Sequence, residues 1–306
     1  MYIYYVAYKE DESLVAKLEL SSLFKEEVIE KIIISDYDYP IDRCVYFKAK
    51  LKVMEKAANL KELIDSLKEK EYHIDDYKVE YIKNEFSQFD YQQRLTMCSA
   101  VGYEILGEFN LRSPRNLLGL IDFKGYIYFG RLTYSNKGWM KYKNKPYSFS
   151  TALPVRLARS LVNIADPDLK YQIIDPCCGV GTVVLEALDL NANIACSDAS
   201  FPNIKSTRKN LEYYNYHLFA NYCRIEDIKE VYDVAIIDLP YGHYAKISYQ
   251  AQLSILKAAS KIANQLVLVT SEVFDQELND LGYEFVRVHH LKQSFKRYIY
   301  RAKLKD

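Results

Sequence analysis

Long apolar runs are absent from this 306-residue sequence, and none approaches the ~18 residues that a membrane-spanning helix needs. The amino-terminal residues also lack the basic start and apolar middle of a signal peptide. We therefore expect no membrane span and a cytoplasmic location. The length is about twice that of a typical ~150-residue domain, and 49% of the residues are apolar, so we expect two well-packed domains. The oligomeric state is left open, with a monomer favoured.

Metal-binding and disulfide patterns are also missing. The six cysteines include no C-x-x-C pair, and the five histidines include no pair at zinc-ligand spacing. A dense disulfide framework is typical of much shorter secreted chains. We therefore expect reduced thiols and no metal site.

Net charge is the third absence, because 41 Lys and Arg balance 41 Asp and Glu. No global field then draws the chain to nucleic acid or to anionic lipid. The balance is uneven along the chain, however: residues 112–145 carry a net charge of +7, and residues 287–305 carry +7 without a single acid. This asymmetry indicates a polyanion-binding face. The alternative is two solvated basic surfaces without a ligand.

The chain divides by its pattern of secondary structure. From residue 171 onward, short apolar runs alternate with helical stretches, which predicts a parallel sheet covered on both faces. The last two runs, 284–291 and 297–304, are joined by a short link that suits an antiparallel hairpin at the sheet edge. The first ~145 residues read as mixed α+β. We expect a small α+β subdomain over 1–45, a second domain over 46–135, a linker over 136–148 and an α/β domain over 149–306.

A glycine turn, D-P-C-C-G-V-G-T, occupies residues 175–182 between an apolar strand and a helix. Val184 stands where a dinucleotide fingerprint needs a third glycine, and no G-K-[ST] of a P-loop follows. S-adenosylmethionine (AdoMet) fits better, because its ammonium can pair with Asp175 and its carboxylate can meet backbone N–H groups at the helix start. The predicted cofactor-binding residues here are Asp175, Pro176, Cys178, Gly179, Gly181 and Thr182, with Thr151 in the segment before them.

Further acids follow the next two strands. Asp198 ends the strand after the turn, where a carboxylate can accept hydrogen bonds from both ribose hydroxyls. Asp227 follows the third strand and is placed to accept from the adenine amino group, with Glu226 as its alternative. Each acid alone is equally compatible with helix capping or a surface position. Three acids after three successive strands favour one cofactor site.

The fourth strand, residues 232–238, ends in D-L-P-Y-G. Together with the glycine turn, Asp198 and Asp227, this signature resembles the [DN]-P-P-Y amino-group methyltransferases. The resemblance is closest to the tRNA guanine N2-methyltransferases, which join a THUMP-containing amino-terminal region to a Rossmann-like catalytic domain. The helix motif P-V-R-L-A-R-S-L-V-N-I at 154–164 supports it, and the resemblance covers about residues 145–245.

The resemblance implies an α/β fold class, with a Rossmann-like AdoMet-dependent methyltransferase domain and an α+β THUMP-like amino-terminal region. Asp238 and the Pro240 carbonyl would each accept one hydrogen of the target amine, and Tyr241 would stack on the extruded base. Cys177 and Leu239 depart from the family pattern, which usually has an aromatic residue and a proline at these positions. Leu239 is expected to alter the loop that presents the carbonyl.

The implied substrate is tRNA, with Arg112, Arg115, Lys141 and Lys143 as candidate RNA contacts in the first basic stretch. The same arginines and lysines are equally compatible with an ordinary solvated surface. Two other enzymatic substrates remain open: a guanine N2 in rRNA and an adenine N6 in DNA. A non-catalytic RNA-binding paralogue is the rival from another class.

Overall fold

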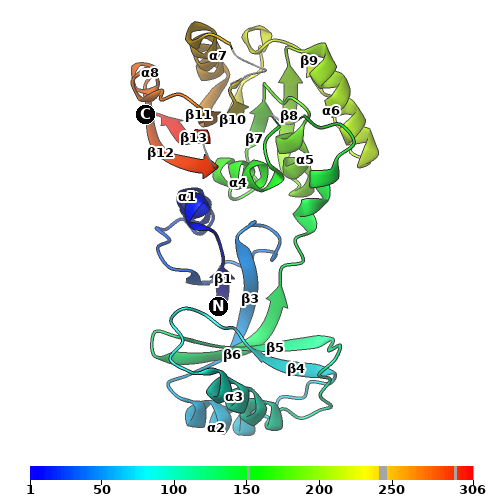
Figure 1. Ribbon diagram of the computed structural model, residues 1–306, viewed down its shortest axis with the longest axis vertical. Coiled ribbons are helices and arrows are strands. Elements are labelled where there is room, and N and C mark those ends of the chain that lie inside the picture. The colour runs from blue at the N-terminus through cyan, green and yellow to red at the C-terminus, as the bar shows by residue number, and fades with distance from the viewer. Residues whose placement is uncertain (150–151, 241–246, 293–294, 306) are drawn as a thin grey trace. The chain divides into compact units, whose positions relative to one another are not determined.

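A computed structural model describes residues 1–149, 152–240, 247–292 and 295–305 of the chain (Figure 1). The chain forms two compact units. The first contains Met1–Ala7 and Ile29–Asn136, and the second contains Tyr8–Val28 and Lys137–Asp306. Thr151 and Tyr241, two of the predicted site residues, lie outside the described residues.

The first unit is built on a mixed six-stranded sheet in the order β2-β1-β3-β6-β5-β4, in which only the β4–β5 pair is parallel. Its helices pack on one face, where apolar residues of α2, α3, β5 and β6 form one core, and a second apolar cluster covers the opposite face. The elements are β1 Tyr2–Val6, β2 Ile32–Ser35, β3 Phe47–Ala57, α2 Leu60–Lys70, β4 Tyr77–Tyr81, α3 Tyr91–Tyr103, β5 Asn116–Phe123 and β6 Tyr126–Tyr134.

The second unit is built on a seven-stranded sheet in the order β12-β13-β11-β10-β7-β8-β9. Its described helices and short turns are η1 Glu10–Glu12, α1 Ser13–Phe24, η2 Gly138–Asn144, α4 Val155–Ala165, α5 Thr182–Asp189, α6 Phe201–Tyr213, η3 Ile225–Asp227, α7 Tyr249–Ile262 and α8 Asp275–Asp280. Its strands are β7 Gln172–Asp175, β8 Asn193–Asp198, β9 Asn221–Tyr222, β10 Tyr232–Asp238, β11 Ala263–Thr270, β12 Tyr283–Lys292 and β13 Phe295–Leu304.

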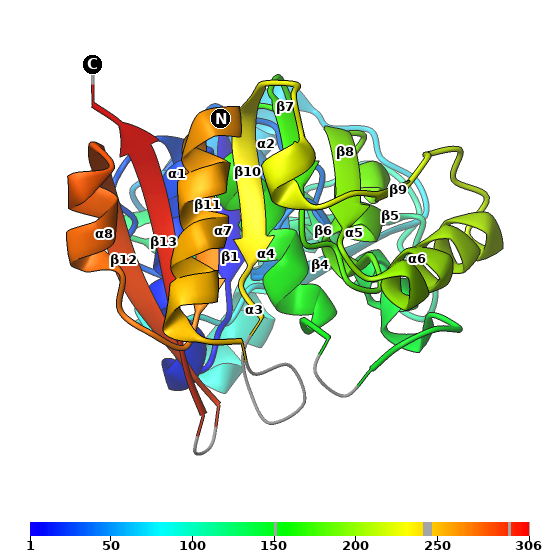
Figure 2. The same cartoon turned by 90° about the horizontal axis from the view of Figure 1, so that it is seen from above.

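The five strands β9, β8, β7, β10 and β11 run parallel, and β13 inserts antiparallel between β11 and β12. This is the doubly wound arrangement that the alternating pattern predicts, so the α/β, Rossmann-like fold class is confirmed for this unit. The strand order reverses between β7 and β10, and α/β sheets bind ligands at such a switch point. The predicted edge hairpin is also present, as β12 and β13 (Figure 2).

Both faces of this sheet are buried, as the unbroken apolar runs require. On one face Ala235 and Ile237 of β10 pack in a core cluster with Leu256 of α7. The alternate residues Val234 and Ile236 are equally buried, and α4 packs against the same strands. Since successive strand residues point to opposite faces, α4 and α7 cover opposite sides of β10 and β11.

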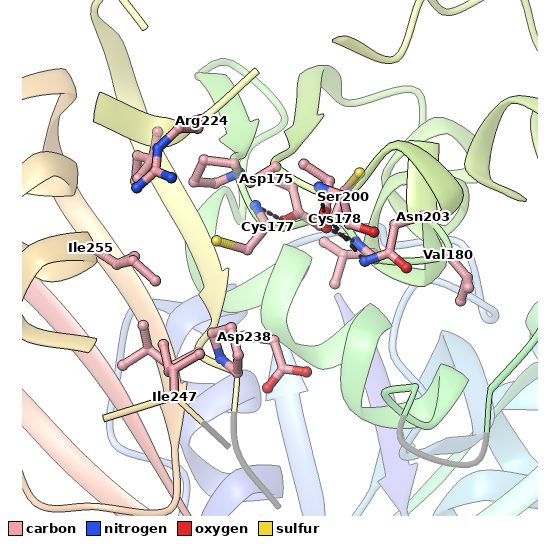
Figure 3. Close-up of a pocket in the computed structure, with 18 of the residues that line it drawn as sticks. Asp175, Cys177, Cys178, Val180, Ser200, Asn203, Arg224, Asp238, Ile247 and Ile255 are labelled. Atoms are coloured by element: carbon pink, nitrogen blue, oxygen red, sulfur yellow. Dashed lines mark hydrogen bonds between the residues drawn. The ribbon is translucent and has the colours of Figure 1, made fainter. Parts of the chain in front are cut away.

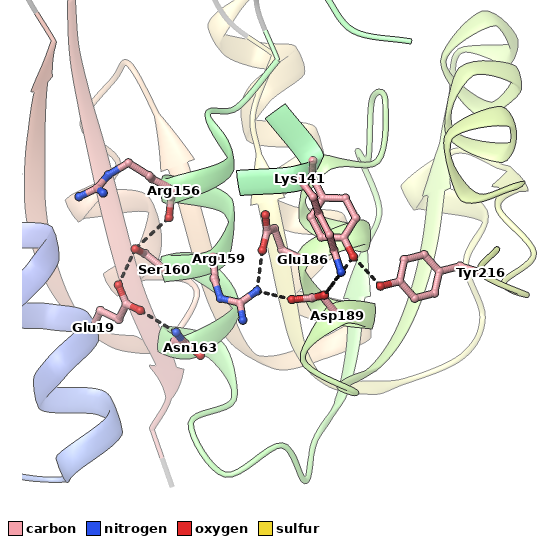
Figure 4. Close-up of polar contacts among 10 residues, drawn as sticks. Glu19, Lys141, Arg156, Arg159, Ser160, Asn163, Glu186, Asp189 and Tyr216 are labelled. Carbon is pink, nitrogen blue, oxygen red and sulfur yellow. Dashed lines mark hydrogen bonds and ion pairs between the residues drawn. The ribbon is translucent and has the colours of Figure 1, made fainter. Parts of the chain in front are cut away.

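Helix α1 belongs to the second unit although it comes from the amino-terminal end of the chain. Glu19 of α1 is fully buried, and its carboxylate accepts hydrogen bonds from Ser160 Oγ (2.5 Å) and Asn163 Nδ2 (2.6 Å) of α4 (Figure 4). Arg156 of α4 also forms a bidentate ion pair with Glu12. A buried carboxylate is tolerable only with such donors, so α1 and α4 are specified as neighbours.

The division differs from the limits expected at 45, 135 and 148. Residues 1–45 are shared between the two units, and 136–148 contains η2, which packs on α4 and α5. Hydrogen bonds between residues far apart in sequence decide this grouping. No helix in the described ranges is both long and apolar enough to cross a membrane.

We predict that Glu19→Ala destabilises the second unit. It removes the carboxylate that accepts from the Asn163 amide and the Ser160 hydroxyl, and Ser160 then keeps only the Arg156 carbonyl as acceptor. Loss of a buried hydrogen-bond partner costs about 1–3 kcal/mol. Urea unfolding followed by circular dichroism measures the loss. Lys17→Ala, on a half-buried position of the same helix, is the control. An equal effect of the two substitutions would contradict the interpretation.

Candidate functional site

The glycine turn joins β7 to α5 and is held by backbone contacts on both sides. The Cys178 N–H donates to the carbonyl of Ser197 on β8 (3.0 Å), and the Gly181 N–H donates back to the Cys178 carbonyl (2.8 Å). Gly179 and Gly181 have φ of 56° and 79°, in the left-handed region that favours glycine. A Cβ on Gly179 would meet open space, whereas one on Gly181 would lie 2.9 Å from Thr207 Cγ2. Gly179 therefore leaves the backbone open to a ligand, and Gly181 allows close packing of α6.

A cavity of about 640 Å³ opens over this turn, at the carboxyl edge of the sheet (Figure 3). Polar Ser200 and Asn203 lie on one side of it, and apolar Ile247 and Ile255 lie on the other. Of the predicted site residues it is lined by Asp175, Pro176, Cys178, Gly179, Thr182, Asp198, Asp238 and Pro240. One cavity therefore gathers residues spread over more than sixty positions of the sequence. Gly181 is not in the lining and caps α5 instead.

Asp198, at the end of β8, is a structural acceptor as well as a cavity residue. Its carboxylate receives hydrogen bonds from the N–H groups of Gly179 and Ser200, both at 2.8 Å, and from Asn203 Nδ2 at 3.2 Å. Burial raises the pKa of Asp198, and these donors oppose the rise. The side chain thus ties the glycine turn to the start of α6 while it faces the cavity.

Asp175 is almost completely buried at the end of β7. Burial raises the pKa of its carboxyl well above the ordinary value; the Cys177 N–H opposes the rise, and the Asp198 and Asp238 carboxylates add to it. Burial, with the carboxylates of Asp175, Asp198 and Asp238, also raises the pKa of the Cys177 thiol well above its ordinary value, which disfavours the nucleophilic thiolate. A cation in the cavity would favour the charged form of Asp175.

The D-L-P signature continues directly from β10. Leu239 is buried, and its N–H donates to the Val269 carbonyl of β11 (3.0 Å), which extends the parallel pairing one residue past Asp238. A proline here would have no N–H to donate, so the departure from the family pattern adds a hydrogen bond. The Pro240 carbonyl also lies 3.5 Å from Gln252 Nε2 of α7.

The structure places Glu226, rather than Asp227, in the cavity lining. Asp227 is exposed on η3, and its N–H donates to the Arg224 carbonyl. Arg224 itself lines the cavity and pairs with Glu226 at 3.4 Å, a position that the sequence reasoning missed.

The lining from α7 was also missed, although its spacing is visible in the sequence. Ala251, Ser254 and Ile255 recur three to four residues apart, which puts them on one face of α7, and Ile247 lines the cavity from just before the helix. Such spacing predicts that one face of the helix is buried, but it does not tell whether that face packs in the core or lines a cavity. Phe149, half-exposed, completes the lining from the segment before α4.

The basic stretches do not form single surfaces. Residues 112–145 are shared between the two units, and within them Lys145 is buried and Lys141 pairs with Asp189 at 2.6 Å. Lys143 and Arg112 are exposed, and Arg115 is largely exposed while pairing with Asp76 at 3.1 Å.

In the second stretch, Arg287 of β12 lies opposite Tyr300 of β13, so it faces the side of the sheet away from Arg301. The charge asymmetry of the sequence is therefore distributed over several faces. Among the described residues, no group of three or more His, Cys, Asp or Glu side chains is arranged to hold a metal ion.

Comparison with known proteins identifies this region. Residues 143–275 match the family model described as RMKL-like, methyltransferase domain. This part of the chain is a methyltransferase domain. The match confirms the predicted resemblance to amino-group methyltransferases and, with the glycine turn, the predicted cofactor AdoMet.

The chain also resembles a curated relative. A stretch of 101 residues is 27% identical to a tRNA (guanine(10)-N2)-dimethyltransferase of Methanothermobacter thermautotrophicus. It covers 32% of this chain, and the chain spans only 30% of that relative's length.

Two solved structures extend the comparison. TrmN from Thermus thermophilus superposes with a TM-score of 0.51 at 12% identity, over 99% of both chains, and shows a shared fold. Magnesium protoporphyrin IX methyltransferase from Synechocystis PCC 6803, with bound SAM, gives a TM-score of 0.44 at 16% identity, over 56% of this chain and 92% of its own.

We predict that Asp175→Asn stabilises the methyltransferase domain at neutral pH. The pKa of Asp175 is raised in the folded state, so its stabilising contribution is present below the unfolded-state pKa of about 3.9 and falls as the pH rises toward the folded-state pKa. Asn keeps the acceptor for the Cys177 N–H without the titration. Urea unfolding from pH 4 to 8 should therefore show a growing advantage of the variant.

Asp227→Asn, on an exposed carboxyl, controls for the loss of one negative charge. A difference between wild type and Asp175→Asn that stayed constant over this pH range would refute the assignment.

Proposed function

We propose that this protein is an AdoMet-dependent methyltransferase that methylates the exocyclic N2 of a guanine in tRNA. The observation that carries the proposal is one cavity lined both by the glycine turn and by Asp238 and Pro240 of the D-L-P-Y signature. A donor pocket and two hydrogen-bond acceptors for an amine then share one space. The local match to a tRNA (guanine(10)-N2)-dimethyltransferase supports the choice of substrate.

The cavity residues fit the donor in charge and shape. AdoMet supplies a methyl group already activated on a sulfonium. Asp175 offers a buried carboxylate for its ammonium, and the open space over Gly179 admits a ligand against the backbone. Asp198 keeps lone pairs for ribose hydroxyls, because a carboxylate has about four acceptor sites and three contacts occupy this one.

Asp238 and the Pro240 carbonyl would act on the amine. The guanine N2 is a weak nucleophile because its lone pair is delocalised into the ring. If each acceptor takes one N–H, the nitrogen becomes more tetrahedral and its lone pair is directed at the methyl group. Asp238 then receives the proton released on transfer, as a general base. The main contribution of the protein is therefore alignment.

RNA rather than DNA is proposed on two grounds. The curated relative acts on tRNA by its name, and the first unit carries exposed arginines, Arg112 and Arg115, suited to phosphate contacts. We propose the first unit as the THUMP-like RNA-binding region, with Lys141 and Lys143 contributing from the second unit. The protein would act in the cytoplasm, where tRNA is modified.

We expect purified protein to transfer label from AdoMet to tRNA, and to leave rRNA and duplex DNA unlabelled. Mass spectrometry of the digested nucleosides should find N2-methylguanosine in the product. Label confined to DNA would refute the RNA assignment. Label in rRNA alone would refute tRNA as the substrate and identify rRNA in its place.

We expect Asp238→Ala to lower kcat by roughly 10²-fold or more, in keeping with general base catalysis, while tRNA affinity is retained. Single-turnover methylation and a filter-binding assay measure the two quantities. Glu230→Ala, on an exposed carboxylate just before β10, is the control. Activity that survives Asp238→Ala would exclude this carboxylate as the base, and a wild type that binds tRNA without any turnover would point to a non-catalytic paralogue.

A further inference from the structure

Two walls of the cofactor cavity come from segments that are far apart in sequence. One wall is the glycine turn at 178–182, and the other includes Phe149, the last residue of the segment 145–149. Both segments are in contact with the same helix, α6, which lies outside the motifs that predict the site. Two of the helix side chains that touch them, Thr207 and Asn210, are fully buried, whereas Lys209, which donates to the Tyr147 hydroxyl, is exposed.

Asn210 of α6 contacts both walls at once. Its Nδ2 donates to the Val180 carbonyl of the glycine turn (2.9 Å) and to the Tyr147 carbonyl (2.8 Å). Its Oδ1 accepts from the Tyr147 N–H (3.0 Å). The amide thus makes three hydrogen bonds, all to backbone, and joins the two walls through a single side chain.

Thr207, one turn earlier on α6, contacts only the glycine turn. Its hydroxyl donates to the Gly179 carbonyl (2.8 Å), and its methyl group packs where Gly181 lacks a Cβ. Thr207 and Asn210 are three residues apart and therefore lie on one face of the helix. The pair differs in one respect, since Thr207 supports one wall and Asn210 supports both.

We propose that Asn210 is a positioning residue for AdoMet binding, which sets Phe149 over the cavity in register with the glycine turn. Neither segment is part of a strand, and Asn210 is hydrogen-bonded to both, so its side chain helps to fix the separation of the two walls. A buried amide with every hydrogen bond made to backbone permits little movement of either segment. A cavity held in its binding shape avoids the ordering cost that a loose segment would add on binding. This inference rests on the proposed cofactor.

The test compares two double-mutant cycles by isothermal titration calorimetry with AdoMet. Asn210→Asp removes both N–H donors and keeps the size of the side chain, and Thr207→Val removes only the hydroxyl. Phe149→Ala removes the wall contact itself. Asn210→Asp and Thr207→Val are each measured alone and in combination with Phe149→Ala. The control is Lys205→Ala, at an exposed position of α6.

We expect Asn210→Asp to raise the Kd for AdoMet about tenfold or more, and Phe149→Ala to add little to it, because Phe149 is already displaced. The effects of Thr207→Val and Phe149→Ala should multiply, because Thr207 does not contact the 145–149 segment. In steady-state assays Asn210→Asp should raise the KM for AdoMet more than it lowers kcat. If Asn210→Asp does not fold, Asn210→Ser, which leaves room for water at the two carbonyls, replaces it in the same cycle.

Multiplying effects of Asn210 and Phe149 substitutions, with AdoMet bound normally by wild type, would overturn this inference alone. Asn210 would then support the fold without placing Phe149. A wild-type protein that binds no AdoMet would overturn the proposed function, and this inference with it.

Discussion

The burial of carboxylates at one edge of the sheet is the constraint on which the site depends. Three parallel strands end in an aspartate, at Asp175, Asp198 and Asp238. Because parallel strands end at the same edge of the sheet, these three carboxylates lie at one edge. Burial and mutual repulsion raise the pKa of Asp175. Such a cluster is poorly matched to an empty, solvent-free interior and well matched to a ligand that brings positive charge, as a sulfonium with an ammonium does.

The same side chains shape the site and bind in it. Asp198 holds the glycine turn through the Gly179 N–H while its carboxylate remains open to the cavity. Gly181 provides the left-handed conformation, and Thr207 packs against the missing Cβ. These contacts fix the conformation of the turn before a ligand binds. Such preorganisation matters for an enzyme whose main contribution is to align its two substrates.

Helix α4 shows how the methyltransferase domain incorporates chain from outside its motifs. Helix α4 contacts Glu19 of α1 through Ser160 and Asn163, and its Arg159 pairs with Glu186 and Asp189 of α5 (Figure 4). Asp189 in turn binds Lys141 of η2. Burial raises the pKa of Glu186 to about 8, although the contact with Arg159 opposes the rise. Because removing both groups from water is costly, the pair contributes little net stability, and its main role is to fix α4 beside α5. An expected linker thereby becomes part of the domain.

Local sequence determined the alternating strands and helices, the glycine turn and the D-L-P-Y signature, because these depend on residue type at fixed spacing along one segment. The placement of Asp175, Asp198 and Asp238 at one edge followed from parallel topology alone. Tertiary structure decided what spacing cannot encode: that Glu226 and Arg224 line the cavity in place of Asp227, that one face of α7 closes it, and that α1 joins the second unit. These outcomes rest on hydrogen bonds and packing between residues distant in sequence, whose partners no local pattern names.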